Sequence, residues 1–269
     1  MNSQNKIDTS RVAILSTVIN FNLYDKTSKL YPDYRRFVID GRDKMYAMNS
    51  IRYMLRKLRN EKIDWLIMAD EDVVFIAPDK IQGLIEHMSQ NDYMFCGVRD
   101  GGMVRHRTFS PYAINTFFSV INFAKLQQIW NEEECLAQQF TVPDEFDDDL
   151  SQLRYPYDTN VLYEPYYCFY FWMRRKGLKP LYLDSRDVKD DAVANVVSDH
   201  AGNEIVCHTW YSRAYEKDVA QTNRINALIE SFGLSRANTR NHKIFKDGLF
   251  KWRKKIKLFI KHRILRKHS

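Results

Sequence analysis

The sequence predicts an α/β fold in which a mixed, mostly parallel sheet is flanked by helices. Apolar segments of strand length alternate with helical patterns through roughly the first half of the 269 residues, and this alternation is typical of parallel sheets. Hydrophobic residues make up 45% of the chain, which is enough to bury a sizeable core. No stretch has the Gly/Ser or Pro composition of a flexible linker. These observations favour one substantial domain with a small appendage.

The first half alternates strands and helices in chain order. We expect strands over residues 11–21, 36–39, 64–69, 93–98 and 116–123. A helix is expected over 45–58, where apolar residues recur every three or four positions, and another begins at Pro78. A third helix is expected to run through Gln138. The less regular second half should contain a polar loop at 99–112, an acidic loop at 144–149, an aromatic helix at 166–175 ended by Gly177, and strands at 181–183 and 205–208.

The net charge of +7 is unevenly distributed along the chain. Residues 236–269 hold 13 of the 41 basic side chains and one of the 34 acidic ones, a net charge of +12. The other 235 residues hold 28 basic and 33 acidic side chains, a net charge of −5. A partner that prefers cations is therefore expected to meet the basic tail and not the body.

The cysteines and the N-terminal residues indicate a reducing compartment. The four cysteines lie far apart without a CxxC pair, which argues against a zinc ribbon or a redox motif. The first ten residues are polar and lack the apolar core of a signal peptide. No window approaches the ~20 apolar residues that span a bilayer. We expect a cytoplasmic protein.

Three acidic residues, Asp70, Glu71 and Asp72, directly follow a short apolar segment of the kind found in buried strands. In open α/β sheets, ligands bind beyond the carboxyl ends of the strands, where this triplet falls. If the segment stays extended, Asp70 and Asp72 point to the same side and can converge on one cation. Carboxylate oxygens suit Mg²⁺ or Mn²⁺. The alternative is a solvated turn that caps the next helix.

Several other phosphate-binding and hydrolase motifs are absent. An apolar strand ending in Asp-Glu also resembles the Walker B segment of ATPases, but that interpretation requires a GxxxxGK[ST] loop. The only nearby glycines with this spacing, Gly97 and Gly102, are followed by Met103 and Val104 and not by the required Lys and Ser or Thr. The sequence has no GxGxxG or GxSxG motif. An ATPase, a dinucleotide-binding enzyme and a serine hydrolase with a nucleophile elbow are therefore not favoured.

The segment DWLIMADEDVVF, with two preceding strands and the later CHTWYSR, resembles bacterial GT-A-fold glycosyltransferases that build surface polysaccharides. The resemblance covers residues 11 to 215. It implies a GT-A-like, Rossmann-like sheet and a D-x-D motif that holds a divalent metal, Mn²⁺ or Mg²⁺, against the donor's diphosphate. By this resemblance Asp70, Asp72 and His208 are the expected metal ligands, and Arg213 is expected to brace the diphosphate.

The same resemblance assigns the donor and catalytic residues. The expected nucleotide-sugar contacts are Thr17, Asp40, Arg42, Asn49, Asp70, Glu71 and Arg213. Inverting relatives often carry a Glu-Asp pair before the aromatic helix, whereas this chain reads Glu164-Pro165. Glu164 is then the expected base for the acceptor hydroxyl and Asp158 the reserve, and both inverting and retaining mechanisms remain open. The loop at 99–107 is expected either to close over the donor or to be merely solvated.

The basic tail combines an apolar helical face with a basic one. Leu249, Trp252, Ile256, Phe259 and Ile260 fall on one side, which favours docking of 247–267 on an anionic membrane surface. A partner-binding or dimerising helix, giving a homodimer, is the next interpretation. No recognised nucleic-acid module occurs and the body is acidic, so no nucleic-acid partner is expected.

The leading hypothesis is a peripheral enzyme on the inner face of the plasma membrane. It would transfer a sugar from a nucleotide sugar, with a UDP-sugar favoured, to a glycan or lipid-linked acceptor. We expect a catalytic domain at 1–235, with a nucleotide-binding half at 11–98 and an acceptor half at 99–215, and a basic amphipathic helical tail at 236–269. The alternatives are a nucleotidyltransferase of related fold and a non-catalytic membrane-associated adaptor.

Overall fold

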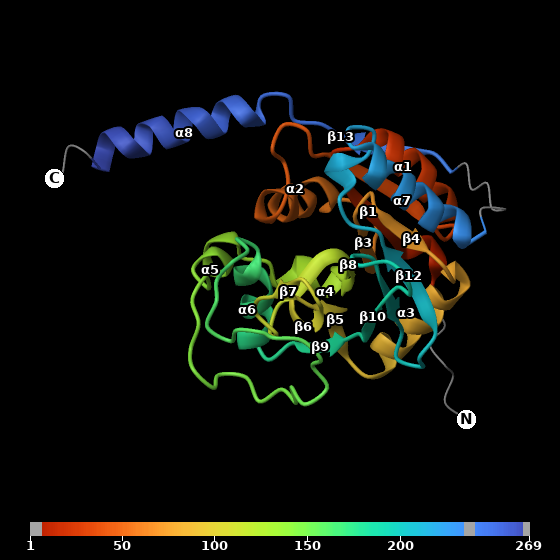
Figure 1. Cartoon of the computed structure of the whole chain (residues 1–269). Coiled ribbons are helices and arrows are strands. Elements are labelled where there is room, and N and C mark those ends of the chain that lie inside the picture. The colour runs from red at the N-terminus through yellow and green to blue at the C-terminus, as the bar shows by residue number, and fades with distance from the viewer. Residues whose placement is uncertain (1–6, 234–239, 266–269) are drawn as a thin grey trace.

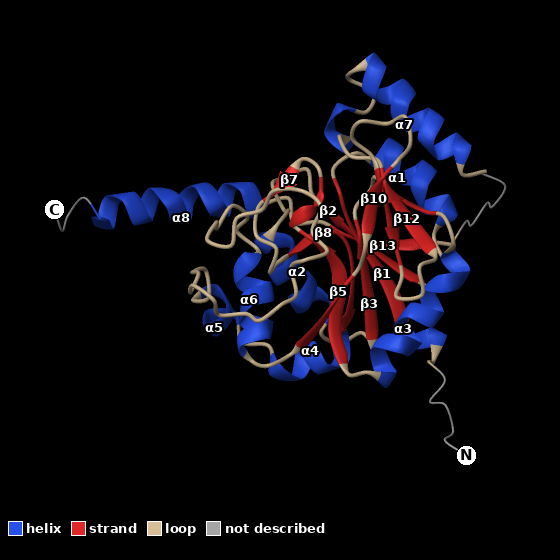
Figure 2. Ribbon diagram, turned by 60° about the horizontal axis from the view of Figure 1, so that its bottom comes forward, coloured by secondary structure: helices blue, strands red, loops and turns tan. Residues whose placement is uncertain are grey.

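The computed structural model describes residues 7–233 and 240–265. Its centre is a seven-stranded sheet with the order β13-β2-β1-β3-β8-β5-β9, and helices cover both faces (Figures 1 and 2). Four of the six neighbouring strand pairs are parallel and two are antiparallel. The prediction of an α/β fold with a mixed, mostly parallel sheet flanked by helices is confirmed. Residues 1–6, 234–239 and 266–269, which include parts of the polar N-terminal segment and of the basic tail, lie outside the described residues.

Three parallel strands form the centre of this sheet: β1 (Val12–Val18), β2 (Arg35–Asp40) and β3 (Trp65–Ala69). All five β3 residues are buried, as expected for a strand covered on both faces. In register, Val18 lies opposite Asp40, and Leu15 lies opposite Met68. The carboxyl ends of the three strands therefore meet at one edge, where the acidic triplet begins.

The remaining strands of the large sheet extend it on both sides. β8 (Ile114–Asn122) pairs antiparallel with both β3 and β5 (Tyr93–Arg99), and β9 (Lys179–Tyr182) pairs parallel with β5. At the other edge β13 (His242–Phe245) pairs parallel with β2. Residues 242–245, within the basic C-terminal segment, thus form a strand of the main sheet.

A second, four-stranded sheet has the order β10-β11-β12-β4 and is antiparallel throughout. Its strands are β4 (Val73–Phe75), β10 (Ser185–Asp187), β11 (Asn195–Ser198) and β12 (Glu204–His208). The short strand β4 starts directly after Asp72, and Val73 lies opposite His208. This pairing carries His208 to the acidic triplet, although the two are far apart in sequence.

The helices pack on the large sheet through the apolar stripes that the sequence predicts. α2 (Met48–Leu58) buries Ile51, Leu55 and Leu58, and α3 (Ile81–Gln90), after the 3₁₀ turn Pro78–Lys80, buries Ile81, Leu84, Ile85 and Met88. The aromatic helix α6 (Tyr167–Arg175) is buried from Tyr167 through Met173, and Gly177 follows with φ +72°. Further helical segments include Thr9–Arg11, Ser28–Leu30, Ser212–Ala214 and α7 (Val219–Ser231).

Three local predictions were wrong. The first strand ends at Val18 and not at residue 21, because the Asn20 side chain accepts a hydrogen bond from Leu23 N and caps α1 (Phe21–Thr27). The helix expected through Gln138 is two helices, α4 (Phe123–Ile129) and α5 (Glu132–Leu136), since Asn131 caps the second.

The third wrong prediction is the polar loop at 99–112. It contains an antiparallel hairpin of β6 (Gly101–Val104) and β7 (Arg107–Thr108), and β6 is buried. Gly101 permits this packing, because a Cβ atom there would lie 1.9 Å from the carbonyl oxygen of Phe109. The hairpin brings Arg107 towards the interior.

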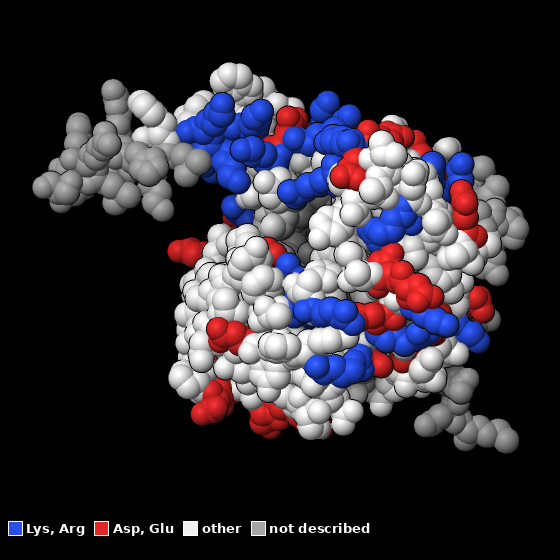
Figure 3. Space-filling model, viewed as in Figure 1, with Lys and Arg blue, Asp and Glu red and all other residues white. Residues whose placement is uncertain are grey.

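The C-terminal helix α8 (Phe250–Leu265) projects away from the body (Figure 1). Four of its apolar side chains, Trp252, Ile256, Phe259 and Ile260, are exposed, with 64% of Trp252 and 60% of Phe259 accessible to solvent. Lysines and arginines gather on its described part and on the adjoining surface (Figure 3). Among the described residues, no helix combines the length and the apolar character needed to cross a membrane.

Candidate active site

A cavity of about 770 Å³ opens where β1 and β3 end. Its walls come from β1, the start of α2, the acidic turn, β8, the segment before α6 and the segment after β12. Its lining includes Thr17, Tyr46, Ala47, Ser50, Asp70, Glu71, Asp72, Arg107, Asn115, Phe117, Glu164, Pro165, Tyr166, His208, Trp210, Tyr211, Ser212 and Arg213. Elements from both halves of the chain thus enclose one site.

The acidic triplet forms a tight turn in which Val73 N donates a 3.1 Å hydrogen bond to Asp70 O. The segment is therefore not extended, and the expected alternation of Asp70 and Asp72 along a strand was wrong. Both carboxylates nevertheless line the same cavity. The Glu71 carboxylate accepts hydrogen bonds from the backbone N–H groups of Ile19 and Asn20, at 3.2 and 3.3 Å. Glu71 thus fixes the segment between β1 and α1.

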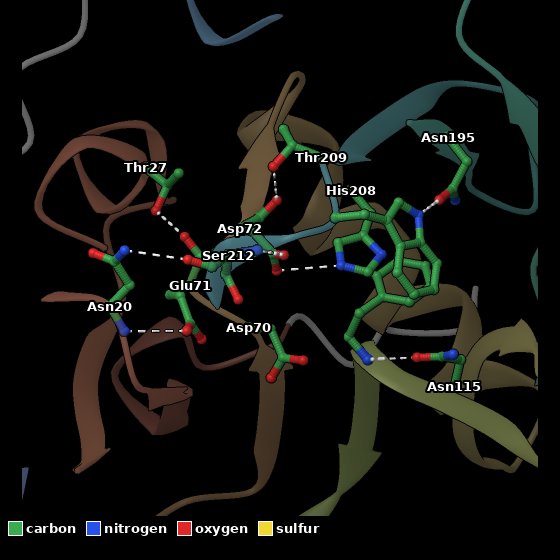
Figure 4. A network of polar contacts seen from close by, with 12 residues as sticks. Asn20, Thr27, Asp70, Glu71, Asp72, Asn115, Asn195, His208, Thr209 and Ser212 are labelled. Atoms are coloured by element: carbon green, nitrogen blue, oxygen red, sulfur yellow. Dashed lines mark hydrogen bonds and ion pairs between the residues drawn. The ribbon is translucent and has the colours of Figure 1, made fainter. Parts of the chain in front are cut away.

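Asp72 and His208 form a close, buried pair (Figure 4). Nε2 of His208 lies 3.2 Å from Oδ1 of Asp72, whose Oδ2 accepts a 3.3 Å hydrogen bond from Ser212 N. The His208 ring stacks on Phe117 at 4.1 Å and contacts Trp210 at 4.0 Å between ring centroids. The aromatic rings leave the imidazole little freedom to reorient.

The site concentrates negative charge at its deep end. Burial, followed by the charges of Glu71 and Asp72, raises the pKa of Asp70 well above its ordinary value. Burial, followed by the charge of Asp72, raises the pKa of Glu71 to about 7. Burial opposes ionisation of Asp72, but His208 and the backbone N–H groups of Ser212 and Asp72 together lower that pKa. A cation placed here would stabilise the ionised carboxylates.

The predicted metal ligands lie around one cavity without forming a closed ligand cluster. Within residues 7–233 and 240–265, no group of three or more His, Cys, Asp or Glu side chains gathers closely enough to hold a metal ion alone. Asp72 and His208 are the pair in contact, with Asp70 two residues away at the end of β3. Nδ1 of His208 is buried and has no hydrogen-bond partner among the described residues.

Glu164 enters the cavity next to a buried charge network. Nη2 of Arg107 donates a 3.1 Å hydrogen bond to Oε1 of Glu164. The same guanidinium binds both carboxylate oxygens of the fully buried Asp100 at 2.7 Å. Asn115 and Tyr167 donate to Asp100 as well, at 2.6 and 2.5 Å. Asp100 therefore holds Arg107 in place, and Arg107 holds Glu164.

Other predicted donor residues divide into two groups. Thr17 and Arg213 line the cavity, and the Arg213 guanidinium lies 5.1 Å from the Tyr46 ring centroid. Asp40 and Arg42 do not line it. They bind each other in a bidentate ion pair at 2.9 and 2.7 Å. Asn49 lies in the first turn of α2 and is also outside the lining.

Asp158, the reserve base, is exposed and outside the cavity lining. Its carboxylate accepts a hydrogen bond from Asn160 N at 2.8 Å within its own loop. Glu164, and not Asp158, is the acidic residue of the acceptor half that lines the cavity.

Sequence reasoning missed Asn115, Tyr46 and the role of Asp100. A signal for Asp100 was present, because it directly follows the buried strand β5 just as Asp70 follows β3. Trp210 stands two residues after His208 within the quoted motif and forms part of the wall. Tyr46 carries no such pattern, since it precedes its helix in an irregular segment where Ala47 has φ +52°.

The chain matches no protein-family model and no curated protein sequence. Among solved structures it is similar to a mannosyltransferase from Pyrobaculum calidifontis in complex with GDP-Man and Mn²⁺, at 12% identity and a TM-score of 0.31, covering 55% of this chain and 54% of that one. A glycosyltransferase involved in glycosylation of the major capsid of PBCV-1 aligns at 14% identity and a TM-score of 0.31, covering 55% and 81%. A cytidylyltransferase from Leptospira borgpetersenii aligns at 11% identity and a TM-score of 0.38, covering 86% and 99%. The chain thus spans about half the length of the mannosyltransferase, and its function has to follow from the geometry of the cavity.

Proposed function

We propose that this protein is a metal-dependent glycosyltransferase of the hexosyltransferase type. In this proposal it moves a sugar from a nucleotide-diphosphate sugar, a UDP-sugar in the first instance, to a glycan or lipid-linked acceptor in surface polysaccharide synthesis. The observation that carries the proposal is one cavity that joins the Asp72–His208 pair to Glu164. Its volume, about 770 Å³, falls in the usual range of small-molecule sites.

Asp72 and His208, with Asp70 beside them, are the proposed ligands of Mn²⁺ or Mg²⁺. Their nearest atoms are 3.2 Å apart, and adjacent ligands of an octahedral ion, each about 2.1 Å from the metal, are separated by roughly 3 Å. These ions commonly bind one or two carboxylates together with substrate phosphates, so two or three protein ligands suit them. The bound ion would neutralise charge on the departing diphosphate.

The chain's own residues supply the other roles in this proposal. Arg213 would donate charge-assisted hydrogen bonds to diphosphate oxygens. Thr17, at the end of β1, would contact the nucleoside. Glu164 would accept the proton of the acceptor hydroxyl, and Arg107 would keep its carboxylate ionised and oriented. The rings of Tyr46 and Tyr211 at the cavity wall would bind the donor's base or sugar.

A thermal-shift screen of UDP, GDP, CDP and CMP, each with and without Mn²⁺, tests this function. A ligand at 100 times its dissociation constant stabilises the folded state by ~2.7 kcal/mol. We expect stabilisation by a nucleoside diphosphate only with the metal, followed by release of that nucleotide from its sugar conjugate when an acceptor is added. Stabilisation by no diphosphate under any condition would favour a non-catalytic adaptor. Stabilisation by CMP alone would favour a nucleotidyltransferase.

The basic helix supports a peripheral membrane location for the same enzyme. Between 247 and 267, the described residues Trp252, Ile256 and Phe259 expose an apolar face of α8, and lysines flank it. Such a helix lies in the interface of an anionic membrane with its apolar face buried. We propose that it holds the enzyme at the inner face of the plasma membrane, with homodimer formation through the same helix as the alternative.

A further inference from the structure

Most exposed apolar side chains on the body belong to the segment from α5 to α6 or line the main cavity. Outside residues 249–260, ten large apolar or aromatic side chains among the described residues are exposed. Six of these belong to the segment from α5 to α6: Leu136, Phe140, Val142, Tyr157, Leu162 and Tyr163. Two more, Tyr46 and Tyr211, line the main cavity. Single exposed apolar residues are ordinary, but a contiguous group usually marks a binding surface.

A second cavity of about 380 Å³ lies within this group. It is lined by Leu136, Gln139, Leu162, Tyr163, Pro165 and Cys168, none of which is charged. Pro165 lines both cavities, and the adjacent Glu164 lines the main one. The candidate base therefore stands at the junction of the two cavities, with its carboxylate in the first and the neighbouring Tyr163 in the second.

The side chains of Gln139 and Cys168 in the second cavity already hydrogen-bond within the protein. Gln139 Nε2 donates to the Glu164 carbonyl at 3.0 Å, and Gln139 Oε1 accepts from Cys168 N at 2.8 Å. The Cys168 thiol donates to the Pro165 carbonyl at 3.4 Å. One face of Tyr163 stacks on Phe109 with ring centroids 3.8 Å apart, which leaves the other face exposed. A ligand in this cavity thus meets apolar surface and few free hydrogen-bonding groups.

We propose that the second cavity binds a hydrocarbon chain carried by the acceptor, next to the hydroxyl that Glu164 activates. This inference rests on the proposed transferase function and narrows its acceptor to a lipid-linked one. A sugar ring needs hydrogen bonds that the engaged amide and thiol do not offer, whereas a hydrocarbon chain gains about 25 cal/mol for each Å² of apolar surface removed from water. Pro165 borders both sites, so the apolar site adjoins the catalytic one.

The probe is decyl maltoside below its critical micelle concentration, titrated calorimetrically into the full chain, with maltose as the headgroup control. Leu162→Asp and Leu136→Asp place a carboxylate in the second cavity at exposed positions. Val219→Asp is the matched control, because Val219 is 77% exposed on α7 and lines neither cavity. Any binding to α8 is common to all three variants. We expect at least tenfold weaker decyl maltoside binding at one site in both cavity variants and unchanged binding in the control.

Equal binding by all three variants, or equal affinity for maltose and decyl maltoside, would overturn the inference. A change of sedimentation coefficient in Leu162→Asp without the probe would instead identify a contact between two copies of the chain and would also overturn it. The Mn²⁺-dependent nucleotide shift, measured on the same samples, separates the two proposals. If the nucleotide shift is present but no site binds the hydrocarbon chain, only the lipid inference is refuted. If the wild-type protein shows no nucleotide shift, the transferase proposal is refuted.

Discussion

Arg107 donates a 3.1 Å hydrogen bond to Glu164, and the two residues are 57 positions apart in the sequence. Burial raises the pKa of Glu164, and Arg107 is the main opposing influence. The same guanidinium binds the buried Asp100. The Arg107 guanidinium thus binds two carboxylates, that of Asp100, which is buried, and that of Glu164, which faces the cavity.

The first prediction concerns Glu164 as the base. Glu164→Gln keeps the shape and can still accept the hydrogen bond from Arg107, but it cannot take a proton. We expect kcat to fall by roughly 10²–10⁴, while the Mn²⁺-dependent nucleotide shift is retained. Asp158→Asn, at an exposed carboxylate outside the cavity, should leave kcat unchanged. Loss of activity in the Asp158 variant alone would reverse the assignment.

The second prediction concerns the pH dependence of the reaction. A base is active when deprotonated, so activity should fall as the pH drops through the pKa of Glu164. Arg107→Gln removes the charge that lowers this pKa, so the pKa should rise further and the acidic limb of kcat/KM should move to higher pH. Arg105→Gln, on the neighbouring exposed side chain, is the control. An acidic limb at the wild-type pH in Arg107→Gln would show that Glu164 does not govern it.

The third prediction concerns stability. Asp100 is fully buried and receives hydrogen bonds from Arg107, Asn115 and Tyr167. Asp100→Asn removes one partner of a buried ion pair, and such a loss costs about 3–5 kcal/mol. Urea denaturation should show this decrease in the free energy of unfolding. Asp92→Asn breaks the exposed pair with Lys125 and should cost about 1 kcal/mol at most. Equal costs for both variants would contradict the structural role of Asp100.

The fourth prediction concerns the metal. Asp72→Asn replaces a charged oxygen ligand by a weaker neutral one while keeping the side-chain shape. The Mn²⁺-dependent part of the nucleotide shift should disappear. The melting temperature without ligand should fall, because the buried charge interaction with His208 is lost, although relief of the repulsion from Glu71 offsets part of this loss. Asp79→Asn, at an exposed position in the 3₁₀ turn Pro78–Lys80, serves as the control. An intact metal-dependent shift in Asp72→Asn would remove the acidic turn from the mechanism.

The fifth prediction concerns α8. Each basic residue near an anionic bilayer contributes about 1 kcal/mol, and Lys254, Lys255 and Lys257 lie on this helix. Reversing all three to Glu should abolish sedimentation with vesicles that contain phosphatidylserine, whereas neither form should bind phosphatidylcholine vesicles strongly. Wild-type binding should weaken as salt rises. Retained binding by the reversed variant would leave partner recognition or a homodimer as the role of α8.

Sequence patterns correctly predicted the strands and helices that depend on residues close together in the sequence. The strand before Asp70 and the buried stripe of α3 follow from apolar runs and helical spacing, and both occur as expected. The hairpin at 101–108 was mistaken for a polar loop because its burial depends on Gly101 packing against Phe109, a contact that spacing does not reveal. Asp40 and Arg42 were expected to contact the nucleotide sugar, but they bind each other. Their closeness in the sequence is compatible with either arrangement, so the sequence does not decide between them.

The site was predictable as far as motifs reach. The acidic triplet and His208 were expected at one site from the sequence, although the triplet was expected to be extended and forms a turn. The β4–β12 pairing brings Asp72 and His208 together. The Asp100–Arg107–Glu164 network was not identified, because Arg107 reaches its two partners only through the hairpin. Long-range contacts among charged groups have no periodic signature, so a sequence pattern cannot specify them.

The pairing of β4 with β12 also sets the order in which the molecule can become functional. Thr209 N donates a 3.0 Å hydrogen bond to Asp72 O across 137 positions of the chain. A nascent chain that has not yet extended past His208 lacks this connection, however well its first sheet has formed. Closing so long a loop is slow and entropically costly. If the proposed function is correct, nucleotide binding therefore arises late, and its appearance during refolding would report completion of the whole body and not of its N-terminal half.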